Sequence, residues 1–92
     1  MKKVEVEIYS DASNISVIRH PGRNYPGSLI QGDTLLSLIQ MAKEIKDEIE
    51  SNNLNDAKEE LDELILQLEE RLDHYEYVLK EHGIDLPYVR NT

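Results

Sequence analysis

The sequence predicts an α+β fold, in which a three-stranded antiparallel β-meander is followed by a long antiparallel helical hairpin packed on one face of the sheet. Three observations support this fold class. Near the N-terminus, apolar and polar residues alternate with the two-residue period of a strand. Two Pro-Gly pairs then mark turns. From residue 33 onward, apolar residues recur every three or four positions, as in an amphipathic helix.

Residues 3–9, KVEVEIY, predict the first strand. Val4, Val6 and Ile8 fall on one face, and the charged residues fall on the other face together with Tyr9. Such alternation is typical of a strand that is buried on one side only. The polar segment SDASN follows at residues 10–14 and has the composition of a turn.

The second strand is expected at residues 15–20, ISVIRH, which are rich in β-branched side chains. Residues 20–23, His-Pro-Gly-Arg, fit a type II turn, because proline presets the first central position and glycine accepts the positive φ of the second. Residues 25–28, Tyr-Pro-Gly-Ser, repeat this pattern. Residues 28–31, SLIQ, then predict a short third strand.

Two amphipathic helices are expected, the first to about Glu50 and the second from about Asn55 to Glu81. Asp33 or Thr34 can cap the first helix, and Gly83 is a typical C-terminal stop for the second. The short polar break between the helices makes them antiparallel neighbours. The apolar stripe of the second helix consists of Leu61, Leu64, Ile65, Leu68, Leu72, Tyr75 and Leu79.

The length of 92 residues fits one domain, covering residues 1–92. Within it, the β-meander spans residues 1–32, the helical hairpin residues 33–82 and a C-terminal tail residues 83–92. The second helix is long for a domain of this size, so part of its stripe is expected to need a cover from outside, unless the helix is kinked or shorter than its pattern indicates. A homodimer through the helical hairpin would supply one.

The chain is acidic, with a net charge of −9 from 19 acidic and 10 basic residues. Four basic and four acidic side chains lie in residues 1–34, so the whole net charge lies in residues 35–92. This balance predicts no nucleic-acid partner, because phosphates would be repelled. No segment is apolar enough for a membrane helix, and there is no cysteine. We therefore expect a cytoplasmic protein without a membrane contact.

No set of residues predicts catalysis, a metal site or a cofactor, so the chain is expected not to be an enzyme. The three histidines, His20, His74 and His82, lie in a loop, in the middle of a helix and at a helix end. Glu70 and His74 lack the Glu-x-x-His spacing of helical metal sites. The glycines of the turns lack the lysine that follows in a phosphate-binding loop.

The stretch RHPGRNYPGSLIQGDT, residues 19–34, is the candidate recognition edge. Its arginines could hold an anion or a carboxylate of a partner. Alternatively, they pair with acidic residues of the same chain and orient the loop. The candidate binding residues are Arg19, His20, Arg23, Tyr25, Gln31 and Asp33.

The same stretch carries a resemblance. The chain resembles a small bacterial family known only as a domain of unknown function, through an Arg-x-Pro-Gly-Arg-x-aromatic-Pro-Gly run, a Gln-Gly-Asp run and a tail. The resemblance covers nearly the whole chain and implies a bacterial, single-domain, non-secreted protein without implying any activity. The matching residues are Arg19, Pro21, Gly22, Arg23, Tyr25, Pro26, Gly27, Gln31, Gly32, Asp33, His82, Gly83, Ile84, Pro87 and Tyr88.

These observations favour a non-catalytic protein-binding module, an inhibitor or immunity-type partner of a basic protein. One alternative is a self-associating structural or accessory protein. A less favoured alternative is a binder of a small anionic ligand at the Pro-Gly loop. The expected acidic interaction face consists of Glu59, Glu63, Glu70 and Asp73. The alternative is that these carboxylates only form the solvated surface of the helices.

Overall fold

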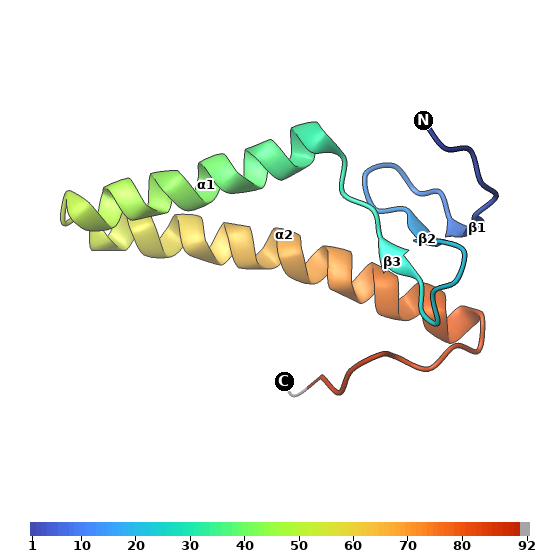
Figure 1. Ribbon diagram of the computed structural model, residues 1–92. Helices are drawn as coiled ribbons and strands as arrows, with labels where there is room; N and C mark the ends of the chain where they lie inside the picture. Colours follow the sequence, from blue (N-terminus) through green and yellow to red (C-terminus); the bar gives the residue numbers. More distant parts are fainter. Residues whose placement is uncertain (91–92) are drawn as a thin grey trace. The chain divides into compact units, whose positions relative to one another are not determined.

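The computed structural model describes residues 1–90 and confirms the α+β class (Figure 1). Three strands form one antiparallel sheet in the order β1-β2-β3, and two helices follow them in the chain. Residues 91–92 of the predicted tail lie outside the described residues. The elements are β1 (Glu7–Ser10), β2 (Val17–Arg19), β3 (Gly27–Ser28), α1 (Gly32–Glu50) and α2 (Leu54–Glu81).

The described chain forms two compact units. The sheet unit joins residues 1–29 to residues 71–90, and the hairpin unit consists of residues 30–70. Helix α2 therefore supplies its first part to the hairpin unit and its last part to the sheet unit. The single domain expected from chain length stays a prediction.

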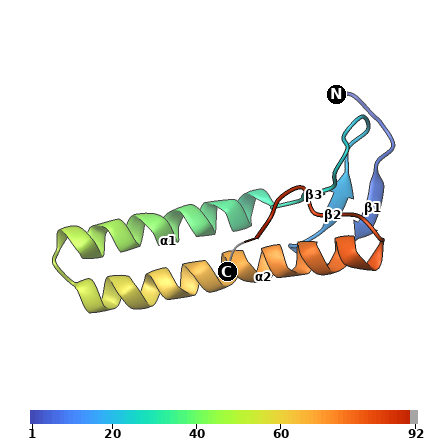
Figure 2. The same ribbon diagram turned by 90° about the horizontal axis from the view of Figure 1, so that it is seen from below.

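The core of the sheet unit lies between the sheet and the last part of α2 (Figure 2). Val17 of β2 and Leu79 of α2 are fully buried, and Tyr75 and Val78 complete the centre. Helical residues three or four positions apart share one face, which explains why these α2 side chains meet the sheet together. Partly buried side chains from β1, α2 and the tail close the core around them: Tyr9, Leu72, Ile84, Leu86 and Tyr88.

The first strand is shorter than predicted, and its faces are exchanged. Ile8 pairs with Ile18, but Ser10 pairs with Val17, so Tyr9 is an extra residue that forms a β-bulge. Tyr9 packs against the core, whereas Ile8 is exposed. The prediction that Ile8 lies on the buried face and Tyr9 on the other was therefore wrong.

The two Pro-Gly pairs adopt different conformations. Gly22 has φ +81° and the amide of Arg23 donates to His20 O at 3.2 Å, which confirms the predicted type II turn. Gly27 has no positive φ and pairs with Ile18 as part of β3. The second predicted turn was therefore wrong, and the third strand begins and ends earlier than expected.

Both helices match their predicted ranges within a few residues, but the first cap differs. Gln31, rather than Asp33 or Thr34, is the N-cap of α1, and its carbonyl accepts from the amide of Leu35 at 2.9 Å. The side chain of Asp33 accepts from the amide of Thr34 at 2.8 Å, within the first turn. An acidic residue there is favourable because of the helix dipole.

The connector between the helices, residues 51–53, is very short. Asn52 has φ +62°, and the amides of Asn52 and Asn53 donate to Ile49 O and Glu48 O at 3.0 and 2.8 Å. This is a Schellman motif with asparagine at the left-handed position. Asn53 also accepts from the amide of Ala57 at 3.0 Å, so one residue ends α1 and starts α2. Figure 1 shows α1 antiparallel to the first part of α2.

Candidate functional site

Arg19 of the predicted recognition edge is engaged by the protein's own residues. Its Nε donates to Glu7 Oε1 at 2.8 Å, and its Nη2 lies 2.6 Å from the same oxygen. The guanidinium also lies 5.7 Å from the centre of the Tyr9 ring. The hydrogen bond from Arg19 lowers the pKa of the Glu7 carboxyl. Arg19 therefore pairs with an acidic residue of its own chain, which is the second of the two roles considered from the sequence.

The other predicted residues of this edge are divided between the two compact units. His20, Arg23 and Tyr25 lie in the exposed loop of the sheet unit, where the His20 ring contacts Pro21 O at 3.1 Å. Gln31 and Asp33 belong to the hairpin unit and serve the start of α1. The loop thus offers exposed cationic and aromatic side chains.

A buried hydrogen bond anchors this loop to α2. The Tyr75 hydroxyl donates to Pro26 O at 2.6 Å, and both residues are buried. Burial raises the pKa of Tyr75, so its hydroxyl keeps its proton at neutral pH. The sequence identified Tyr75 only as part of an apolar stripe, because periodicity does not show which hydroxyl has a partner.

Neighbouring α2 side chains hold the remaining segments of the sheet unit. His74 Nε2 is hydrogen-bonded to Ser10 Oγ at 3.0 Å, and Arg71 donates to Asn14 O. The ring of His82 packs edge-on against Tyr9, with centroids 4.9 Å apart. The first and the third of these contacts give His74 and His82 structural partners within the sheet unit.

The tail is fastened to α2 by a polar cluster that the sequence analysis missed. Arg90 Nη1 donates to Asp73 Oδ1 at 2.6 Å and to Glu76 Oε1 at 2.9 Å. The Tyr88 hydroxyl donates to Glu76 Oε2 at 3.0 Å. Burial, followed by this hydrogen bond, raises the pKa of Tyr88 to about 12. Asp73, predicted to belong to an interaction face, is thus engaged inside the sheet unit.

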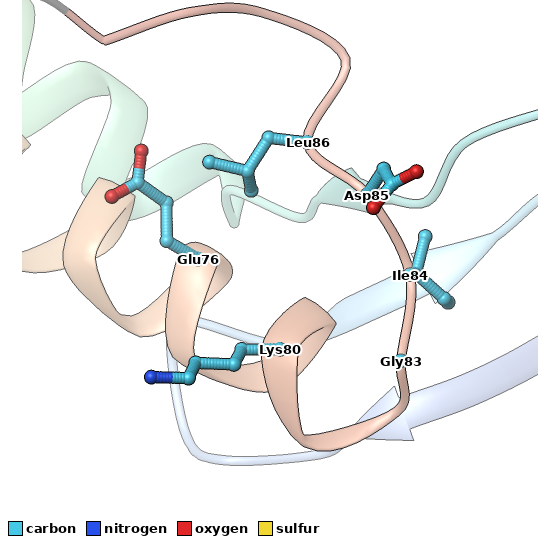
Figure 3. Close-up of a pocket in the computed structure, with 6 residues that line it drawn as sticks. All are labelled: Glu76, Lys80, Gly83, Ile84, Asp85 and Leu86. Atoms are coloured by element: carbon cyan, nitrogen blue, oxygen red, sulfur yellow. The ribbon is translucent and has the colours of Figure 1, made fainter.

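A hollow of about 500 Å³ lies between the end of α2 and the tail (Figure 3). Glu76 and Lys80 line it from the helix, and Leu86 turns back toward the helix from the tail. Because Glu76 already accepts hydrogen bonds from Tyr88 and Arg90, Lys80 and Asp85 are the charged groups left to meet a ligand. One charge of each sign in an open hollow defines no particular ligand chemistry.

The hairpin unit has two chemically different faces. Each residue turns a helix by about 100°, and the buried Leu38, Ile45 and Ala57 mark the sides on which α1 and α2 meet. Because the two helices are right-handed and antiparallel, residues displaced in the same rotational sense from this contact line lie on the same side of the hairpin.

The first side is the acidic face. It contains three of the four acidic residues predicted from the sequence, Glu59, Glu63 and Glu70. The three lysines of the hairpin unit, Lys43, Lys46 and Lys58, all fall on the opposite side by the same geometry. The acidic face consists of Glu44, Glu48, Asp56, Glu59, Glu60, Glu63 and Glu70.

Carboxylates crowd together on this face. Oxygen atoms of Glu44, Glu48 and Glu60 all lie within 4.8 Å of one another, which confirms that both helices contribute to the same side. Partial burial, followed by repulsion from Glu44 and Glu48, raises the pKa of Glu60. Exposed acidic groups often gather in this way without a metal ion, so the spacing alone does not define a metal site.

The second side is the apolar face. Its large side chains are between 41% and 58% exposed, although they follow the helical apolar period. A single helix-helix contact covers only a narrow stripe on each partner, which explains why these residues stay open. The apolar face consists of Leu35, Ile39, Ile49, Leu54, Leu61, Ile65 and Leu68.

The three-stranded sheet and the two helices that follow it define a small α+β protein. A family model, described as a family of unknown function (DUF6959), matches residues 1–88, and the chain belongs to this family. This confirms the resemblance to a family of unknown function. No curated protein and no solved structure matches the chain. Within residues 1–90, neither helix has an apolar run long enough to cross a membrane.

Proposed function

We propose that this chain is a non-catalytic protein-binding module whose acidic face binds a basic protein. The observation that carries the proposal is the acidic face itself, to which two antiparallel helices contribute seven carboxylates and no lysine or arginine. Such a one-sign surface steers an oppositely charged partner and raises its association rate.

The crowding of Glu44, Glu48 and Glu60 supports this proposal. Partial burial is the largest cause of the raised pKa of Glu60, and repulsion from the carboxylates of Glu44 and Glu48 adds to it. A lysine or arginine of a partner placed among these carboxylates would relieve that repulsion, so binding gains energy from strain already present in the free protein. The role we propose is that of an inhibitor or immunity-type partner, whose acidic face binds a basic bacterial protein in the cytoplasm.

The experiment is a capture of partners from the host by the tagged protein at low and moderate salt, compared with a variant of the acidic face. The variant is Glu59→Gln, Glu63→Gln and Glu70→Gln. A charge-matched control, Glu5→Gln, Asp11→Asn and Asp85→Asn, removes three carboxylates from the sheet unit. All six residues are exposed, so both proteins should fold.

We expect the wild type to capture a stoichiometric basic partner, and we expect this partner to be lost as salt rises. The variant of the acidic face should fail to bind the partner, whereas the control should retain it. A partner that binds both variants equally would contradict the role of the acidic face. Recovery of untagged copies of the chain alone would contradict the basic partner.

A further inference from the structure

We propose that the apolar face of the hairpin is covered by a second copy of the chain, with α1 of each copy lying against α2 of the other in a four-helix bundle. The two-fold axis of this dimer runs parallel to the helices. The proposal uses the side of the hairpin opposite the acidic face, so it does not rest on the basic partner.

The exposed area fits such a dimer. Taking the exposed fractions of its seven residues together, the apolar face presents on the order of 600 Å², the upper end for the largest apolar patch of a typical monomer. Two copies placed face to face bury up to about 1,200 Å² from these side chains, which is the lower end of the range of stable specific interfaces.

The proposed dimer also places side chains of α1 opposite side chains of the second copy's α2 that lie at the same height along the hairpin. The connector joins Glu50 to Leu54, and in an antiparallel pair one helix descends as the other rises. Ile39 is therefore level with Ile65, and Lys43 is nearly level with Asp62. A two-fold axis parallel to the helices keeps these heights, so Ile39 meets Ile65 of the second copy, and Lys43 meets its Asp62.

Charges at the rim of the apolar face select this axis. The rim of α1 carries Lys43, Lys46 and Glu50, with Lys46 Nζ 3.9 Å from Glu50 Oε1, whereas the rim of α2 carries Asp62 and Glu69 in addition to Lys58. Two lysines against one glutamate leave the α1 rim with a net positive charge, and two acidic residues against one lysine leave the α2 rim with a net negative charge. A two-fold axis perpendicular to the helices would place α1 on α1, and the lysines would oppose their own copies. Like charges facing each other are unfavourable, whereas α1 on α2 brings opposite charges together.

The first test compares two neighbouring residues of α2. Ile65 belongs to the apolar face and is 41% exposed, whereas Leu66 points away from α1 and is 51% exposed. The molar mass of the wild type, Ile65→Glu and Leu66→Glu is measured by sedimentation at about 100 μM, a concentration at which a micromolar dimer is nearly complete. We expect the wild type and Leu66→Glu to be dimers, and Ile65→Glu to have half their mass with unchanged helicity. A monomeric wild type, or an equal effect of both substitutions, overturns the proposal.

The second test does not depend on how a charged variant folds. Because the chain has no cysteine, Ile39→Cys and Ile65→Cys can be introduced into separate chains that are then mixed and oxidised. We expect a covalent dimer that joins one chain of each kind, and little from either variant alone. Cross-linking of Ile39→Cys with itself, or no cross-linking in the mixture, overturns the proposed axis.

Discussion

The hydroxyl of Tyr75 provides a sharp test of what holds the sheet unit together. Tyr75→Phe removes one oxygen atom and leaves the ring in place, so packing against Val17 and Leu79 is kept. The hydroxyl donates to Pro26 O at 2.6 Å between two buried residues. Its loss leaves a buried carbonyl without this partner, at a cost of about 1–3 kcal/mol. In a domain of this size, each kcal/mol lowers the melting temperature by about 4–8 °C.

Tyr77→Phe is the matched control, because Tyr77 lies two residues further along α2 and its side chain is 56% exposed. We expect this control to change the free energy of unfolding by less than about 0.5 kcal/mol. Both variants and the wild type are unfolded with urea at one protein concentration and followed by circular dichroism. Equal stability of the two variants would refute the structural role assigned to the Tyr75 hydroxyl.

Three further predictions concern other parts of the chain. Asn52→Gly removes the steric cost of φ +62° and should raise the free energy of unfolding by about 0.5 kcal/mol. The control Asn55→Gly lies inside the first turn of α2 and should lower the free energy of unfolding by a similar amount. Both are measured in the same urea titration. Glu60 has a folded-state pKa above its unfolded value, so its contribution to stability is present at low pH and is lost as pH rises through the folded pKa. Glu60→Gln should therefore be more stable than the wild type at pH 7, a difference that disappears near pH 4 in melting curves. Arg90→Gln removes both ion pairs of the tail, so amide hydrogen exchange at residues 84–88 should speed up while exchange in α1 stays unchanged; protection of the tail in this variant would contradict its fastening by Arg90.

The helices could be predicted well because their signals are local. Apolar periodicity sets where α1 and α2 run, and Gly83 with φ +66° ends α2 as expected. The strands could be predicted only in number and order. β2 has three residues before the turn at His20, so β1 has a partner over a short length and residues 3–6 remain outside the sheet. No residue of β1 signals the bulge at Tyr9.

The candidate sites could likewise be predicted where they depend on one helix, and could not be predicted where they depend on how two helices meet. The sequence predicted Glu59, Glu63, Glu70 and Asp73 as one face of a helix, and Asp73 pairs instead with Arg90 of the tail. The sequence could not show that Glu44 of α1 joins the other three, because that depends on how two helices meet. Likewise, the periodicity that predicted a buried stripe does not reveal how much of it a single neighbouring helix leaves exposed.

The connector also has a consequence for the order in which the chain assembles. Its hydrogen bonds join residues at most five positions apart, as from Asn53 to Glu48, so the hairpin can form within microseconds. The sheet unit instead joins Val17 to Leu79 across the whole hairpin segment. A hairpin that forms first brings residues 32 and 70 toward each other before the sheet closes. The slow, long-range step of folding then begins from a much shorter effective loop.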